Sequence, residues 1–356
     1  MSADCEEARP QKRPRTAEET NLQSSTTDTA AASGNLNNLK RHEEFWFDDG
    51  SIILVTRRTT AFRVYRALLA AQSTVFADMF SSSSPSAEEM MEGCPVVHLS
   101  DAPKDVAHFL RVLLPKSQRL LYSRKTTFSF HQISAVIRLA HKYDVQDVLD
   151  QAIESFQEYF TSDFDTWTRG SGGVVRLRSQ HAIGVVNLAR LVDRPALLPI
   201  AFYKCALLGG DVVDGYRRED RTMEYLCRKD VKRCIDGRNE LAEHAIVVVS
   251  AVFGFTQPGE ECASPVRCRS ALQSMLELVV EDECASDADV LASWEGRIHD
   301  WAEDLSLCNL CEKAAVERDV RARRQVWYEL PEIFDVEVEG WVPSEGDGDE
   351  VTGDTP

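Results

Sequence analysis

The sequence predicts an α+β domain, in which a cluster of helices accompanies a short three-stranded sheet, followed by an all-α domain. Two patterns lead to this prediction. Short β-branched runs separated by polar turns occur in the first part of the chain, whereas apolar residues at helical spacing dominate the rest. Hydrophobic residues make up 43% and charged residues 28% of the 356 residues, which is typical of a soluble globular protein.

Composition places the boundaries of these domains. Residues 1–42 carry six acids, six bases and very few large apolar side chains, so they are predicted to be a disordered arm. The α+β domain is expected at 43–160, and the stretch 161–173 is expected to be a linker because it is rich in Gly, Ser and Asp. The all-α domain is expected at 174–342, and 343–356 is expected to be a disordered acidic tail.

Three runs in the first domain are predicted to be strands. Ser51–Val55 is apolar on both faces, as in a buried strand, and Phe62–Tyr65 alternates apolar and polar residues, as expected of its hairpin partner. Pro95–Leu99 is the third strand.

Helices occupy most of the remaining first domain. Arg66–Phe80 is predicted to be helical with an interruption at Ser73, whose hydroxyl can cap a second short helix. Asp101 is the expected N-cap of the next helix, and Pro103 suits its first turn. Two further helices are predicted at His131–Lys142 and Val145–Phe160.

Five blocks in this order, DDGSIILV, FRVYRALLAAQSTVFADMF, CPVVHLSD, DVAHFLRVLL and ISAVIRLAHKYDVQDVLDQAI, resemble a BTB/POZ domain of the type common in fungi. The resemblance covers about a third of the chain. It implies a protein–protein interaction module, often dimeric, without a catalytic centre. Dimers of this family commonly use a strand and the first helix, which here correspond to Phe45–Phe47 and Arg66–Ala71. Tyr65 stands where the family usually has His.

The second domain is predicted to be entirely helical. Its C-terminal end resembles a W-x-x-L-P-x-x-F stretch of the same fungal proteins, matched by Trp327, Leu330, Pro331 and Phe334. The predicted helices are Gln180–Asp193, Pro195–Leu208, Arg228–Cys234, Glu240–Phe255, Arg269–Glu281, Asp287–Leu305 and Cys308–Tyr328.

Motifs of catalysis are missing from the sequence. It contains no G-x-x-x-x-G-K-[ST], G-x-G-x-x-G, G-x-S-x-G or H-E-x-x-H motif, and its eight histidines are scattered. We therefore predict that the protein is not an enzyme, and assign no catalytic, cofactor-binding or metal-binding residue.

Four of the ten cysteines raise the question of a metal site. Cys308-x-x-Cys311 and the earlier pair Cys262 and Cys268 could supply four thiolates to tetrahedral zinc. The five residues between Cys262 and Cys268 exceed the usual two to four, so the sequence favours reduced, buried or surface thiols. Convergence of all four sulfurs to distances of about 3.7 Å would instead indicate zinc.

The formal net charge of −18 disfavours nucleic acid as a partner. Protein partners are expected, including a homodimer formed through the BTB domain. The longest apolar stretch is too short to span a membrane, and the N-terminus does not resemble a secretion signal, so we expect a protein of the cytoplasm or nucleus.

Two alternative functions remain open from the sequence. Lys12, Arg13, Pro14 and Arg15 form a basic cluster that could act as a nuclear import signal, as in a transcription-associated regulator. Met90-Met91-Glu92 fits the loose apolar-x-Glu signal of BTB adaptors for cullin-type ubiquitin ligases.

Overall fold

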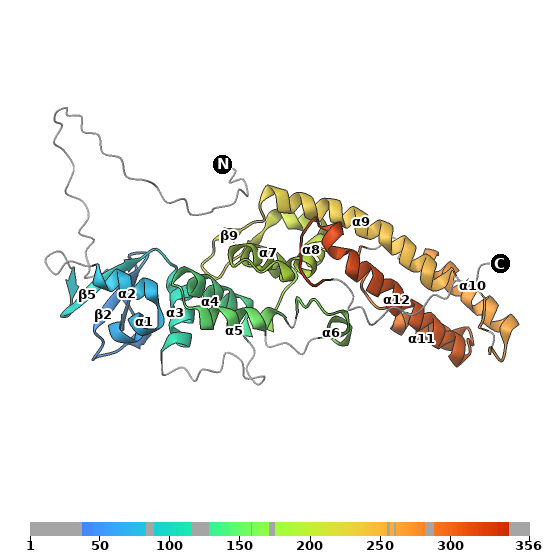
Figure 1. Ribbon diagram of the computed structural model, residues 1–356, viewed down its shortest axis with the longest axis horizontal. Coiled ribbons are helices and arrows are strands. Elements are labelled where there is room, and N and C mark those ends of the chain that lie inside the picture. The colour runs from blue at the N-terminus through green and yellow to red at the C-terminus, as the bar shows by residue number, and fades with distance from the viewer. Residues whose placement is uncertain are drawn as a thin grey trace, which may run out of the picture. The chain divides into compact units, whose positions relative to one another are not determined.

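The computed structural model divides the chain into two compact units (Figure 1). The N-terminal unit contains Met1–Leu121 and Ala135–Asp150, and the C-terminal unit contains Tyr122–Ser134 and Gln151–Pro356. The residues that the structure describes are 38–82, 89–114, 128–157, 159–170, 175–254, 257–259, 261–281 and 288–341.

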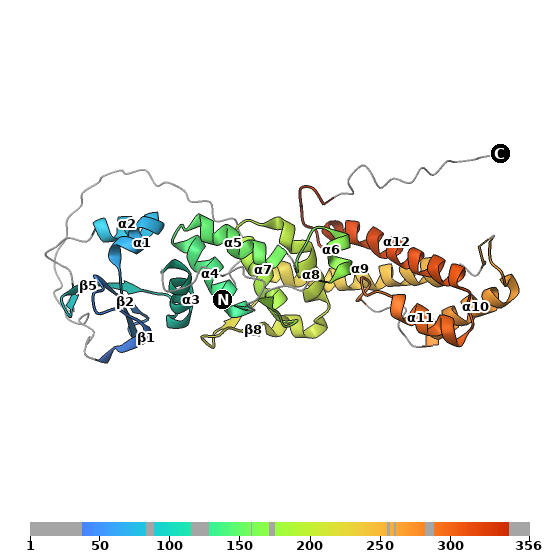
Figure 2. The ribbon, with the colours of Figure 1, turned by 90° about the horizontal axis from the view of Figure 1, so that it is seen from below.

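A mixed five-stranded sheet forms one part of the N-terminal unit, with strand order β1-β3-β2-β5-β4 (Figure 2). β2 pairs with β3 as an antiparallel hairpin, and its other edge pairs with β5 in parallel. All five residues of β2 are buried, as its doubly apolar sequence predicts. The strands are β1 (Lys40–Trp46), β2 (Ile52–Thr56), β3 (Thr60–Val64), β4 (Met90–Met91) and β5 (Cys94–Leu99).

β1 extends the sheet beyond the three predicted strands and begins within the predicted disordered arm. Its first residue, Lys40, donates its backbone N–H to the carbonyl of Thr59 at 2.9 Å. The ring of His42 stacks on Phe62, with 4.7 Å between the ring centroids. The predicted boundary of the arm at residue 42 therefore lies too far along the chain. Contacts with β3 order β1, although its charged sequence gives little indication of a strand.

The helices of the first domain follow the predicted pattern. Ser73 separates the first two, and its hydroxyl oxygen accepts the backbone N–H of Phe76 at 3.0 Å, which confirms the predicted cap. These helices are α1 (Arg66–Gln72), α2 (Thr74–Ser81), α3 (Pro103–Leu113), α4 (Phe130–Lys142) and α5 (Gln146–Gln157).

Asp101 does not cap α3 as expected, because its carboxylate is engaged elsewhere. Ala102 is the N-cap residue and provides no side-chain hydrogen bond. The Asp101 carboxylate accepts hydrogen bonds from the Tyr143 hydroxyl at 2.5 Å and the Lys142 ammonium at 2.7 Å. The Tyr143 ring stacks on Phe76 at 4.3 Å, so Asp101 helps to hold the end of α4 against α2.

The predicted linker at 161–173 contains a helix, α6 (Phe164–Arg169). Its N-cap is Asp163, whose carboxylate accepts the N–H of Thr166 at 2.7 Å. Phe164 and Trp167 both pack against Trp327, with ring centroids 5.7 and 5.6 Å apart. Aromatic contacts with a residue far along the sequence therefore order a stretch that its composition suggests is a loop.

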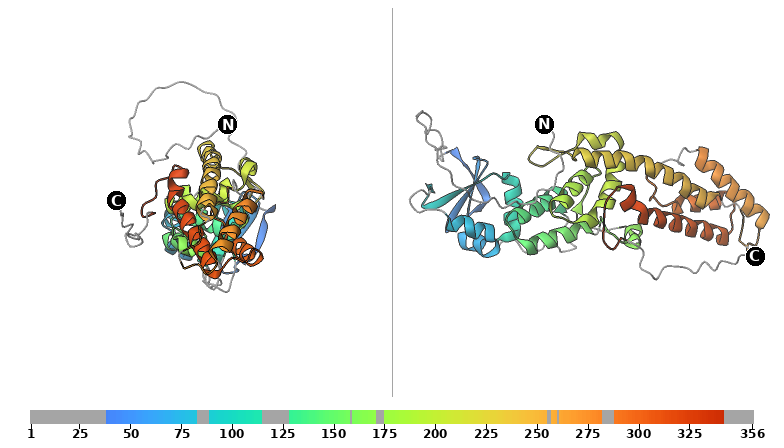
Figure 3. Two further views of the ribbon diagram at one scale, coloured as in Figure 1. Left: turned by 90° about the vertical axis from the view of Figure 1, so that its right-hand side faces the viewer. Right: turned by 45° about the horizontal axis from the view of Figure 1, so that its top comes forward.

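The C-terminal unit is mostly helical rather than purely helical. It also contains two short ladders, β6 (Phe128–Ser129) with β7 (Val175–Arg176) and β8 (Tyr216–Arg217) with β9 (Met223–Glu224). Figure 3 shows the long helices α9 and α12 running beside each other. The described helices that lie wholly in this unit are α6, α7 (His181–Leu191), α8 (Leu198–Ala206), α9 (Arg228–Phe253), α10 (Pro265–Glu281), α11 (Glu295–Asp304) and α12 (Asn309–Ile333), with 3₁₀ turns at Pro195–Leu197 and Gly209–Asp214.

α9 is one continuous helix where the sequence suggests two. Gly237 lies in the gap between the predicted segments, and Phe334 packs directly against it. Phe334 also stacks on Phe202 of α8 at 5.7 Å. The glycine therefore provides space for an aromatic ring and does not interrupt the helix.

This packing makes a testable prediction for Gly237→Ala. Alanine favours helix over glycine by about 1 kcal/mol, but a Cβ at this position would lie 2.4 Å from the Phe334 ring, which is fully buried. We expect the overlap to dominate, with a net loss of about 1–3 kcal/mol in unfolding free energy. Gly296→Ala in α11 is the matched control, because an added Cβ there has no neighbour within 4 Å. Chemical denaturation of both variants measures the difference, and a stabilised Gly237→Ala protein would contradict the packing.

Candidate functional site

The first helix of the BTB-like region presents a neutral surface of small side chains. Ala67 and Ala71 are exposed one turn apart, and Leu68 and Ala70 beside them are partly exposed. Leu69, on the opposite side of the helix, is completely buried. α1 contains no acidic residue, and Arg66 is its one charged residue. A helix surface of this kind allows another backbone to approach closely.

β1 provides a second surface in the same unit, because it is an edge strand of the sheet. It pairs with β3 on one side, and its pairing shifts register between Arg41 and Trp46. Phe45 is buried, whereas Glu43 and Glu44 are exposed. An edge strand has backbone N–H and C=O groups that can pair with another chain, and charged side chains such as these limit unspecific pairing.

The apolar-x-Glu sequence considered for cullin recruitment lies at the other edge of the sheet. Met90 and Met91 form β4, and Met90 is 54% exposed. The Glu92 carboxylate is paired with the guanidinium groups of Arg41 and, at 3.7 Å, of Arg63. The Met90 side chain is thus accessible to a partner, whereas the Glu92 carboxylate is already paired with two arginines.

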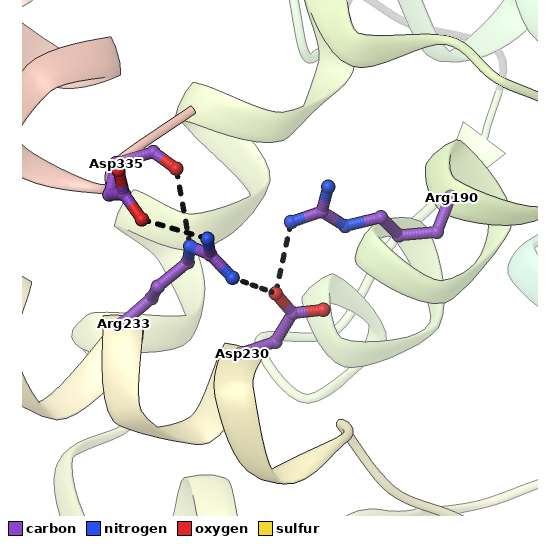
Figure 4. Close-up of polar contacts among 4 residues, drawn as sticks. All are labelled: Arg190, Asp230, Arg233 and Asp335. Atoms are coloured by element: carbon purple, nitrogen blue, oxygen red, sulfur yellow. Dashed lines mark hydrogen bonds and ion pairs between the residues drawn. The ribbon is translucent and has the colours of Figure 1, made fainter. Parts of the chain in front are cut away.

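A network of charged side chains in the C-terminal unit connects α7, α9 and Asp335, which follows α12 (Figure 4). Asp230 is only 3% exposed, and its carboxylate accepts hydrogen bonds from Arg190 at 3.0 Å and Arg233 at 3.2 Å. The Arg233 guanidinium also donates to the Asp335 carboxylate at 2.8 Å. Because a buried carboxylate needs such partners, we interpret this network as structural; it anchors the end of the W-x-x-L-P-x-x-F stretch.

A cavity of about 570 Å³ lies beside α6, α7 and α8, with mixed charges in its lining. The Lys204 ammonium lies 4.6 Å from the centre of the Trp167 ring, and burial lowers the pKa of this lysine. Asp289 also lines the cavity and accepts a hydrogen bond from the Tyr203 hydroxyl. The positive and negative groups offset each other, so this cavity indicates no particular ligand.

The structure brings together the four cysteines considered as metal ligands. The sulfurs of Cys262, Cys268, Cys308 and Cys311 all lie within 4.8 Å of one another. Cys268 and Cys311 are buried, and Cys262 and Cys308 are partly exposed. The four sulfurs therefore converge, and the Cys262–Cys308 distance of 3.7 Å equals the value expected around a zinc ion.

Hydrogen bonds and burial give the thiols of this cluster different pKa values. The backbone N–H of Cys311 lowers the pKa of the Cys308 thiol to about 7, because it stabilises the thiolate. Burial raises the pKa of Cys311 to about 12 and also raises that of Cys268. Among the described residues, Cys227 is disulfide-bonded. Those with free thiols are Cys94, Cys205, Cys234, Cys262, Cys268, Cys308 and Cys311.

Two other expectations concern the ends of the chain and the membrane. Lys12, Arg13, Pro14 and Arg15 lie outside the described residues, so the import signal stays a prediction. Within the described part of the chain, no helix has both the length and the apolar composition needed to cross a membrane.

Comparison with known proteins identifies the first region. The family model of the BTB/POZ domain matches residues 36–159, about a third of the chain. The protein therefore has an N-terminal α+β BTB region with a mixed sheet, followed by a mostly helical region. No curated protein matches the chain. BTB domains generally mediate protein–protein interaction and dimerisation and are typically non-catalytic, which agrees with the prediction of protein partners.

Proposed function

We propose that this chain is a non-enzymatic docking protein whose BTB domain joins two copies of the chain. The observation that carries the proposal is the BTB/POZ match at residues 36–159. The helical region would then be available for a different protein partner. The likeness to BTB proteins of fungi and a location in the cytoplasm or nucleus remain predictions alongside this proposal.

The α1 surface is where we place the contact between the two copies. Proteins with a large net charge of one sign repel their own copies, so self-association favours surfaces without that charge. α1 offers such a surface, since Ala67 and Ala71 are exposed and Arg66 is its one charged residue. Small side chains also lose little conformational entropy when they are buried.

We expect the double variant Ala67→Glu and Ala71→Glu to be monomeric while remaining folded. Both positions are exposed on a helix, and glutamate is a good helix former, so the monomer should tolerate the change. In a dimer, four added carboxylates would meet at one interface and would repel each other. Light scattering of the full chain at tens of micromolar measures the effect as a change in molar mass by a factor of about two.

The matched control adds the same charge elsewhere. Gln151→Glu with Gln157→Glu changes two exposed positions on α5 and should leave the dimer intact. A wild-type protein that is strictly monomeric in this concentration range would contradict the proposal. Dissociation of the control as well as the α1 variant would show that net charge, and not the α1 surface, controls association.

We do not extend the proposal to the two alternative functions. A cullin adaptor is supported only by the exposed Met90, and Glu92 is held by Arg41 and Arg63. A transcription-associated regulator is supported only by Lys12, Arg13, Pro14 and Arg15, which the structure does not describe. Binding of the purified chain to a purified cullin would test the first alternative directly.

A further inference from the structure

Two pairs of cysteines from distant parts of the C-terminal unit meet at the N-terminal ends of two helices. Cys262 lies just before α10, and Cys268 lies in the first part of that helix. Cys308 is the N-cap residue of α12, and Cys311 lies in its first turn. Although 46 positions separate Cys262 from Cys308, their sulfurs are only 3.7 Å apart.

The distances between these sulfurs fit one small metal ion at their centre. In a tetrahedral zinc site each sulfur lies about 2.3 Å from the ion, which sets the sulfur–sulfur distances at about 3.7–3.8 Å. The sulfurs of Cys262 and Cys308 have this separation, and none of the pairs exceeds 4.8 Å. A disulfide needs about 2.05 Å, so Cys262 and Cys308 are too far apart to be bonded to each other. A polynuclear iron–sulfur cluster would hold the sulfurs further apart, because its own atoms lie between them.

Backbone N–H groups are directed at the sulfurs as acceptors. The N–H of Cys308 donates to the Cys268 sulfur at 3.4 Å. The N–H of Cys311 bonds to the Cys308 sulfur, and the N–H of Gly259 bonds to the Cys311 sulfur. Donors in this arrangement stabilise negative charge on sulfur and orient the thiolates, as the groups around metal ligands commonly do. Clustered neutral thiols that only fill a core would not need them.

The surroundings also suit the charge of a loaded site. Each cysteine binds zinc as a thiolate, so loading releases the thiol protons to solvent and leaves four negative charges against two positive ones. Both cysteine pairs lie at helix N-termini, whose partial positive charge favours anions. Arg318 of α12 interacts electrostatically with Cys311 and adds a full positive charge nearby.

We propose that Cys262, Cys268, Cys308 and Cys311 together bind one structural zinc ion that links the start of α10 to the start of α12. Four protein sulfurs complete a tetrahedral shell and leave no position for a substrate, so the ion stabilises the fold and performs no reaction. The ion also accounts for an ordered Cys262, which lies in a segment with few apolar side chains.

The test is metal analysis of the full chain purified without chelator. We expect about one zinc per chain, and X-ray absorption should show four sulfur neighbours at about 2.3 Å. Cys308→Ser should reduce the zinc content to near zero. Cys94→Ser is the matched control, because Cys94 is a buried free cysteine of the other unit and should not affect zinc.

A second measurement keeps the proposal testable if Cys308→Ser fails to fold. Wild-type protein in which cobalt replaces zinc should show the intense visible bands and sulfur-to-metal charge-transfer bands of tetrahedral thiolate coordination. Wild-type protein without bound metal, whose four thiols all react with a thiol reagent under native conditions, would overturn the proposal. Iron in place of zinc would overturn the choice of metal, and unchanged zinc in Cys308→Ser would overturn the choice of ligands.

Discussion

Leu69→Asp is expected to unfold the N-terminal unit. Leu69 is completely buried on the inner side of α1, as the helical pattern predicts. The substitution removes an apolar contact that is worth about 2–5 kcal/mol in the core and adds the cost of burying a carboxylate without a partner. The sum is comparable to the whole stability of an ordinary domain. Hydrogen exchange of the full chain should show lost protection in α1–α3, while the long helices of the C-terminal unit keep theirs.

Ala67→Asp is the matched control for this experiment, because it places the same side chain on the exposed side of the same helix. Because Ala67 also lies on the proposed dimer surface, the variants are compared at a concentration at which the wild type is monomeric. There Ala67→Asp should change the free energy of unfolding by less than about 0.5 kcal/mol. Burial raises the pKa of a carboxyl group, so the damage in Leu69→Asp should diminish as the pH falls towards the ordinary aspartate pKa of about 4. A Leu69→Asp protein with wild-type protection would contradict the burial of this residue.

Elements with a strong local pattern could be predicted from the sequence. β2 is buried along its whole length, and its run of β-branched and aliphatic residues indicates this directly. Ser73 interrupts a helical stretch, and its hydroxyl caps α2 as expected. The BTB prediction depends on several such elements in a fixed order, and the family match confirms it.

Elements that depend on distant contacts could not be predicted in the same way. α6 is ordered by Trp327, far along the chain, although the stretch 161–173 in which it lies has the Gly, Ser and Asp content of a loop. In α12, Arg323 is 4% exposed and pairs with the buried Asp319 at 2.8 Å, although charged side chains on a helix usually face solvent. An ion pair four residues apart fits either side of a helix, so only tertiary packing decides which side it occupies.

The cysteine cluster shows the same limit for a site. Each of the four residues could be selected from the sequence, because cysteine is rare and Cys308-x-x-Cys311 has a recognised spacing. The wider spacing of Cys262 and Cys268 argues against zinc only if the two residues lie on one continuous turn. In the structure Cys262 precedes α10 and Cys268 lies within it, so the chain has room to bring both sulfurs to one point.

Trp327→Ala is expected to cause the largest loss of stability in the C-terminal unit. Trp327 is fully buried, and three other aromatic rings lie around it: Phe164, Trp167 and, at 5.4 Å, Trp341. Removing a buried tryptophan costs about 3–5 kcal/mol, because the surrounding side chains close the resulting cavity only in part. α6 depends on this contact, so its backbone amides should exchange much faster with solvent, even under conditions in which α9 remains folded.

Trp327→Phe separates the effect of volume from that of hydrogen bonding. The indole Nε1 of Trp327 has no hydrogen-bond partner in the described part of the chain, so phenylalanine removes volume without breaking a bond. The indole of Trp341 donates to the backbone carbonyl of Trp327 at 2.9 Å, which either substitution can preserve. We therefore expect Trp327→Phe to lose clearly less stability in chemical denaturation than Trp327→Ala. Equal losses in the two variants would contradict a role based on ring packing, because phenylalanine retains most of the aromatic contact area that alanine removes.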